Sequence, residues 1–122
     1  ADRARSNTPQ QALVLLNDPT YVEAARAFAA RILVEGGAGT RDRIRWAWRQ
    51  AVQRDPSATD AAELAAMIDR IRSHYKTDPA AAEALLRVGA APRPSTVDPV
   101  ELAAWTNAAR VILSLHETIT RN

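Results

Sequence analysis

Two histidines are the side chains of this sequence best suited to metal binding or proton transfer. His74 and His116 are 42 positions apart and fall in different predicted helices. A zinc site needs three or four ligands with short spacings among some of them, and this pair does not offer such a spacing. The last predicted helix carries one apolar stripe, formed by Leu102, Trp105, Ala109, Ile112 and Ile119. His116 is expected on the same stripe, which is typical of a core histidine. A ligand or pH-sensing role for His116 is the alternative.

Other catalytic signatures are weak. Ser114 and Thr118 could act as nucleophiles, but the sequence places no base beside either hydroxyl, and a nucleophile without a base is inert. The sequence contains no cysteine and therefore no C-x-x-C-H haem motif. Residues 36–39 (Gly-Gly-Ala-Gly) lack the lysine and the preceding strand of a phosphate-binding loop, so they predict a helix end. We expect no enzyme activity, no cofactor and no metal site.

The most distinctive surface candidate is a predicted helix rich in arginine. Arg41, Arg45 and Arg49 repeat every four residues, and Trp46 is expected nearly opposite the apolar face that carries Ile44. Such a face could contact phosphates and stack on bases, or dock on an acidic surface of a neighbouring domain. A purely structural alternative pairs these arginines with acids of the preceding and following helices, with Trp46 covering another helix. The sequence leaves all three hypotheses open.

Length and composition limit the possible classes. With 122 residues the chain predicts a single domain. It has 16 basic and 14 acidic residues, a net charge of +2, and Lys76 is its only lysine. This small excess gives weak support for nucleic-acid binding, which usually involves a concentrated basic patch. No apolar run approaches the roughly 20 residues that span a bilayer.

Proline-containing start signals mark most of the predicted helices. Ser, Thr, Asp or Asn caps the first free backbone N–H groups, and proline fits the next position because it needs no donor there. Such pairs occur at Thr8-Pro9, Asp18-Pro19, Asp78-Pro79 and Asp98-Pro99. Gln11 and Glu101 stand three residues after Thr8 and Asp98, which predicts two capping boxes.

These signals, together with apolar residues at helical spacing, predict an all-α fold: a compact bundle of five to six helices in one domain over residues 1–122. The first helix has apolar residues on every side, which is typical of a buried helix. A loop with two prolines covers residues 89–96. The predicted helices span residues 9–16, 19–35, 41–54, 58–76, 79–88 and 99–120.

Several stretches resemble one known family. Residues 6–13 (SNTPQQAL) and 16–26 (LNDPTYVEAAR) resemble the C-terminal part of the planctomycete PSD1 domain, also called DUF1553. Residues 43–49 (RIRWAWR) fit in spacing, and residues 113–121 (LSLHETITR) are similar to the closing segment of that family. The chain departs from the family at Ser114 and His116, where Asn and Asp are usual.

The resemblance implies a fragment of a large, exported, multidomain bacterial protein, often with a cytochrome-c-like domain upstream. It implies no established activity and therefore no catalytic residues. We expect a non-catalytic structural or docking domain in the periplasm or outside the cell, whose partners are other domains of the parent protein or another protein. The alternative is a nucleic-acid-binding module that uses Arg41, Arg45, Trp46 and Arg49.

Overall fold

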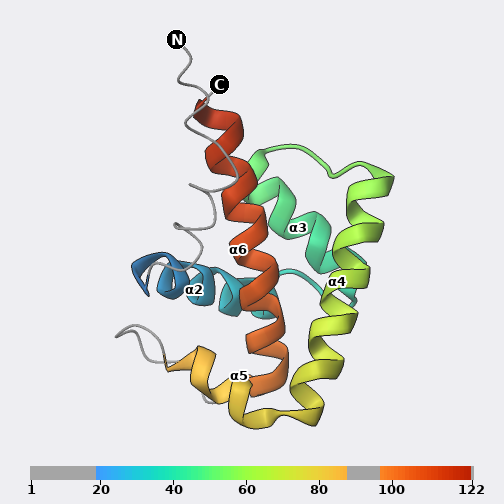
Figure 1. The fold of residues 1–122 in the computed structure, drawn as a ribbon. Coiled ribbons are helices and arrows are strands. Elements are labelled where there is room, and N and C mark those ends of the chain that lie inside the picture. Colours follow the sequence, from blue (N-terminus) through green and yellow to red (C-terminus); the bar gives the residue numbers. More distant parts are fainter. Residues whose placement is uncertain (1–18, 88–96, 122) are drawn as a thin grey trace.

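Five helices make up the described part of the chain (Figure 1). The computed structural model describes residues 19–87 and 97–121, with side chains for residues 20–87 and 97–115. The predicted first helix (9–16) and the predicted loop (89–96) lie outside the described residues. No strand occurs in the described segments, so the all-α prediction is confirmed. The helices are α2 (Pro19–Glu35), α3 (Thr40–Val52), α4 (Ala58–Thr77), α5 (Pro79–Leu86) and α6 (Pro99–Arg121).

Helix starts follow the capping chemistry of the sequence. The Ser57 hydroxyl accepts a hydrogen bond from the backbone N–H of Asp60 at 3.0 Å, and α4 begins directly after it. The Asp78 carboxylate accepts from Ala81 at 3.3 Å and starts α5. The Asp98 carboxylate accepts from the N–H of Glu101 at 3.1 Å before α6. Helix ends were harder to predict: α3 ends two residues before the expected residue 54, and α5 two residues before residue 88.

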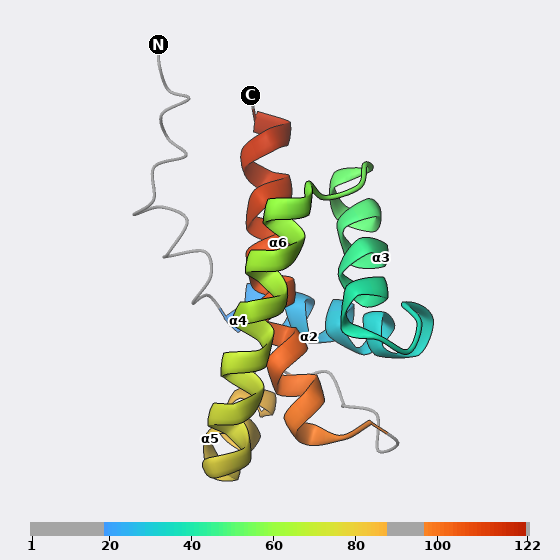
Figure 2. The same ribbon diagram turned by 90° about the vertical axis from the view of Figure 1, so that its right-hand side faces the viewer.

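Helix α6 is the centre of the bundle and contacts each of the other four described helices (Figures 1 and 2). Leu102, Trp105, Ala109 and Ile112 expose none of their surface, so the predicted apolar stripe of this helix is confirmed over these turns. The side chain of Ile119, predicted on the same stripe, lies outside the described residues.

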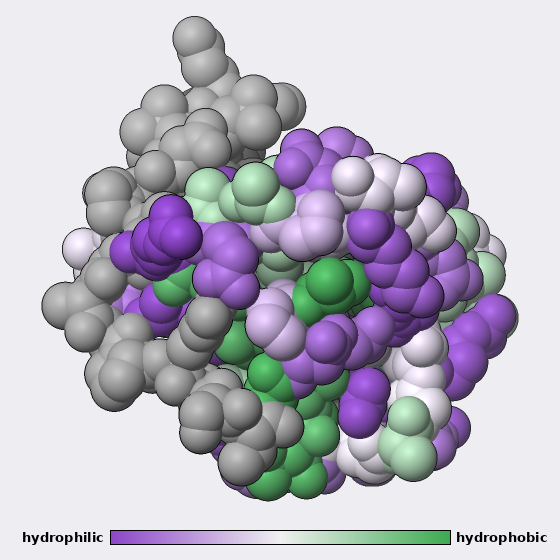
Figure 3. Space-filling view, turned by 90° about the horizontal axis from the view of Figure 1, so that it is seen from below, coloured by the Kyte–Doolittle hydropathy of each residue, from purple (hydrophilic) through white to green (hydrophobic). Residues whose placement is uncertain are grey.

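The other helices direct apolar residues at α6, at the i, i+3 and i+4 positions that share one helix face. The view from the α5 end of the molecule shows hydrophilic and hydrophobic residues side by side, with a hydrophobic area next to the atoms drawn in grey (Figure 3). The buried apolar residues outside α6 are Val22, Ala25, Phe28, Ala29, Ile32, Ile44, Ala47, Trp48, Ala51, Leu64, Ile68, Tyr75, Ala82 and Leu86.

A buried arginine joins α2 to the end of α5. Arg26 is only 4% exposed, and its guanidinium donates a hydrogen bond to the backbone carbonyl of Leu86. The last carbonyls of a helix have no partner within the helix, and a cation is favoured at that end. Arg26 therefore caps α5 from a neighbouring helix.

The predicted capping box at the start of α6 forms only in part. Asp98 caps the N–H of Glu101, but the Glu101 carboxylate binds the guanidinium of Arg72 on α4. The two hydrogen bonds measure 2.5 Å from Arg72 Nε and 3.1 Å from Arg72 Nη2. Glu101 thus forms an ion pair between helices, because a partly buried guanidinium is a stronger partner than a backbone N–H.

Candidate interaction surface

The turn between α2 and α3 sets the position of the arginine-rich helix. Gly36 donates its N–H to the carbonyl of Ile32 at 2.8 Å, and Gly37 follows with φ of +99°, a conformation that favours glycine. Arg43 Nε then donates to the carbonyl of Gly37 at 2.9 Å. This bond ties the first turn of α3 back to the end of α2, so residues 36–39 end one helix as predicted and also orient the next.

Three of the four candidate residues lie on the exposed side of α3. Arg41, Arg45 and Arg49 are all exposed. Arg45 lies 3.9 Å from Asp42 in its own helix, and Arg49 lies 3.1 Å from Asp55 in the segment after it. The structural hypothesis placed their partners on the helices before and after, and these contacts show that it was wrong for Arg45 and Arg49.

Trp46, the fourth candidate residue, is half-buried rather than fully outward-facing. Its ring lies 6.2 Å from the ring of Phe28 on α2, between centroids. The guanidinium carbon of Arg31 lies 5.3 Å from the Trp46 centroid, within the range of a cation–π interaction. Trp46 therefore covers part of α2, as the structural hypothesis expected of this residue. The spacing of residues within α3 could not predict this contact, because Phe28 and Arg31 of α2 lie beside a residue outside the apolar stripe of α3.

Charge is distributed unevenly along the chain. Residues 31–55, from the last turns of α2 to the segment after α3, contain six arginines and three acidic residues. The whole chain carries a net charge of only +2. The positive excess is thus confined to this corner, and the remainder of the chain is slightly acidic. A localised field of this kind attracts an acidic partner more strongly than the total charge suggests.

A hollow of about 430 Å³ lies in this basic corner. Its lining from α3 consists of Asp42, Arg45, Trp46, Arg49 and Gln50, and Gly36 and Gly37 line it from the turn before α3. We call it the basic hollow, because its two arginines outnumber its one carboxylate. Three of the four predicted surface residues therefore lie around one concavity, which the sequence could not show because the glycine turn forms its other wall. Arg41 does not line it.

His74 does not line the basic hollow. His74 is exposed near the end of α4, where its ring lies 5.5 Å from that of Tyr75. Residue 116 belongs to α6, but its side chain lies outside the described residues, so the predicted core role of His116 stays a prediction. Among described residues, no group of three or more His, Cys, Asp or Glu could hold a metal ion. In the same segments, no helix has the length and apolarity needed to cross a membrane.

Residues 1–68 of the chain match the PSD1 family, described as a protein of unknown function (DUF1553). The chain belongs to the PSD1 family. The matched part includes α2, α3 and the first half of α4, and so contains every residue that lines the basic hollow. The resemblance of residues 113–121 to the closing segment of PSD1 proteins lies outside the matched residues. No curated protein and no solved structure matches the chain.

Proposed function

We propose that this PSD1 chain is a non-catalytic docking domain whose basic α3 face binds an acidic surface on a neighbouring domain or a protein partner. The observation that carries the proposal is the confinement of the positive excess to residues 31–55, with Arg41, Arg45 and Arg49 exposed. Arginine and tryptophan are favoured anchors of protein interfaces. Complementary charge steers the encounter and sets its orientation. By family resemblance, the parent is a large exported bacterial protein, often cytochrome-c-associated.

Nucleic acid is the competing ligand because it is also anionic. A base-stacking platform needs an open aromatic face. The Trp46 ring packs beside Phe28 and has the Arg31 guanidinium over it. This arrangement supports a protein partner, for which a half-buried tryptophan edge is sufficient.

The first test uses the complete reading frame that contains the chain. We expect a signal peptide and further domains upstream of Ala1, some with a C-x-x-C-H motif. In that full protein, amide hydrogen exchange of α3 should be slower than in the isolated chain, because docking covers the helix. A reading frame that begins close to Ala1 and encodes a cytoplasmic protein would contradict the proposal.

Charge reversal tests the face itself. Replacing Arg41, Arg45 and Arg49 together by Glu should restore fast exchange at α3 in the full protein. The matched control reverses three exposed cations elsewhere, Arg70, Lys76 and Arg87, and should leave exchange at α3 unchanged. Tight binding of duplex DNA whose log affinity falls steeply with log salt would instead support the nucleic-acid function.

A substrate screen with His116→Ala as control tests for enzyme activity.

A further inference from the structure

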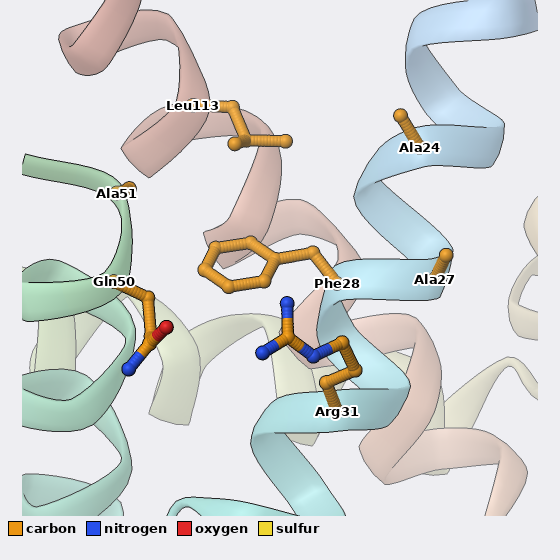
Figure 4. A pocket seen from close by; sticks show the side chains of 7 residues that line it. All are labelled: Ala24, Ala27, Phe28, Arg31, Gln50, Ala51 and Leu113. Atoms are coloured by element: carbon orange, nitrogen blue, oxygen red, sulfur yellow. The ribbon is translucent and has the colours of Figure 1, made fainter.

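A second hollow, the apolar groove, lies between α2, α3 and α6 and has a volume of about 480 Å³. Figure 4 shows the Phe28 ring extending from α2 toward α3, with Leu113 of α6 on one side of it. Below this ring, Arg31 of α2 and Gln50 of α3 point toward one another. The groove is therefore apolar over most of its surface and polar at one end. Its lining residues are Ala24, Ala27, Phe28, Arg31, Gln50, Ala51 and Leu113.

The apolar groove and the basic hollow are neighbours. Gln50 lines both of them. Arg31 lines the groove and stacks over Trp46, which lines the basic hollow. The two concavities thus form one surface that changes from apolar to basic, with the Arg31–Trp46 pair at the boundary.

We infer that this combined surface binds an amphipathic helix of another protein or domain, whose apolar face enters the groove and whose acidic residues reach Arg45 and Arg49. The inference rests on the proposed function and specifies the partner. Charge complementarity selects the acidic end. Arg31 lies at the polar end of the groove, and Arg45 and Arg49 line the adjoining basic hollow. Arg45 and Arg49 lie 3.9 Å and 3.1 Å from Asp42 and Asp55, but residues 31–55 still contain six arginines against three acidic residues, so this corner stays positive. A trough between packed helices accepts a further helix through side chains at i, i+3, i+4 and i+7.

The small residues of the groove favour close approach of such a helix. Ala24 and Ala27 are exposed on α2, and Ala51 forms the α3 wall. Short side chains leave room for larger apolar side chains of the partner, which would also contact Phe28 and Leu113. Burying this apolar surface supplies affinity, at roughly 25 cal/mol per Å², while the arginines supply orientation.

The test uses synthetic peptides of about 16 residues, long enough for four helical turns. The probe carries leucines at i, i+3, i+4 and i+7 with glutamates at one end, and a second version carries the glutamates at the other end. One comparison peptide has lysine in place of glutamate, and another has serine in place of leucine. We expect calorimetric titration to detect binding of at least one leucine–glutamate peptide, and at least tenfold weaker binding of both comparison peptides.

Protein variants locate the binding site. Ala27→Glu places a carboxylate in the apolar groove and should weaken binding at least tenfold. Ala66→Glu is the matched control, since Ala66 is an exposed helical alanine on α4 and lines neither hollow. Circular dichroism should show that both variants keep the helix content of the parent chain. Equal weakening by both variants would overturn the inference.

The remaining outcomes separate this inference from the proposed function. If the serine peptide binds as tightly as the leucine peptide, and reversal of Arg45 and Arg49 abolishes binding, the groove is not used but the basic face still docks. If reversal of these arginines changes nothing, both proposals fail. If sedimentation shows a dimer that Ala27→Glu converts to a monomer, a second copy occupies the groove, which overturns the inference.

Discussion

Arg72 on α4 and Glu101 on α6 form a two-point ion pair, with hydrogen bonds of 2.5 Å and 3.1 Å. Only 19% of the Arg72 side chain and 27% of the Glu101 side chain are exposed. Solvent therefore screens this pair less than a surface ion pair. The contact joins the central helix to α4 and supports the bundle that holds α2 and α3 in place.

We expect Glu101→Gln to lower the free energy of unfolding by about 1–2 kcal/mol, because the charged, bidentate contact becomes a weaker neutral one. The matched control is Glu35→Gln. Glu35 lies 3.6 Å from Arg31, with about half of each side chain exposed. Loss of that pair should cost less than about 0.5 kcal/mol. Urea denaturation measures both, and equal losses would show that the Arg72 pair behaves as an ordinary surface pair.

The same pair sets an expected pH dependence. The hydrogen bond that Arg72 donates to the Glu101 carboxylate raises the pKa of Arg72 above its ordinary value, with burial acting in the opposite direction. Since the pKa is raised in the folded state, this stabilisation is fully present below the ordinary arginine pKa and is lost only in strongly alkaline solution. The difference in unfolding free energy between wild type and Glu101→Gln should therefore be the same at about pH 7 and about pH 9. A clear decrease at the higher pH would contradict this assignment.

Arg26 should be far more important for stability than its single charge suggests. Arg26→Ala removes a buried hydrogen bond to the Leu86 carbonyl and leaves a cavity. We therefore expect the free energy of unfolding to fall by about 2–4 kcal/mol. Hydrogen exchange should show that α5 opens first, because its C-terminal end loses its cap. Arg70→Ala, at an exposed position of α4, is the control and should change stability by less than about 0.5 kcal/mol. Similar losses for both variants would argue against this role.

Local chemistry explains what the sequence could predict. Ser57, Asp78 and Asp98 cap their helices through atoms three residues away, so the starts of α4, α5 and α6 follow from a few neighbouring residues. The apolar stripe of α6 is likewise a property of one helix. The exposure of Arg41, Arg45 and Arg49 could be predicted for the same reason, since these three residues share one edge of α3.

Contacts between helices explain which features the sequence could not predict. The positions of Phe28 and Arg31 against Trp46 depend on how α2 crosses α3, which no spacing within either helix encodes. The apolar groove was missed for this reason. Arg26 did leave a signal: it stands four residues after Val22 and three before Ala29, so it interrupts the apolar stripe of α2. An arginine at such a position indicates a buried partner.

The glycines after α2 should differ sharply in their tolerance of a side chain. A Cβ atom on Gly36 would lie 2.6 Å from the carbonyl oxygen of Ile32, so Gly36→Ala requires a backbone shift. The nearest atom to a Cβ on Gly39 is Asp42 Oδ2 at 3.9 Å, an ordinary contact. We expect Gly36→Ala to lower the free energy of unfolding by about 1–3 kcal/mol, and Gly39→Ala to lower it by about 0.5 kcal/mol or less. Thermal denaturation of the two variants measures this, and equal melting temperatures would contradict it.

The start of α4 offers a direct test of capping. Ser57→Ala removes the hydroxyl that accepts from the Asp60 N–H, leaving that donor to water, so we expect a loss of about 1 kcal/mol. Ser73→Ala makes the same chemical change at an exposed position inside α4. Alanine is the better helix former there, so stability should stay unchanged or rise by a few tenths of a kcal/mol. Urea denaturation measures the change in unfolding free energy of each variant. A loss for Ser57→Ala together with no loss for Ser73→Ala would confirm that the Ser57 hydroxyl caps α4. If Ser57→Ala leaves stability unchanged, packing against α6, rather than the cap, determines where α4 starts.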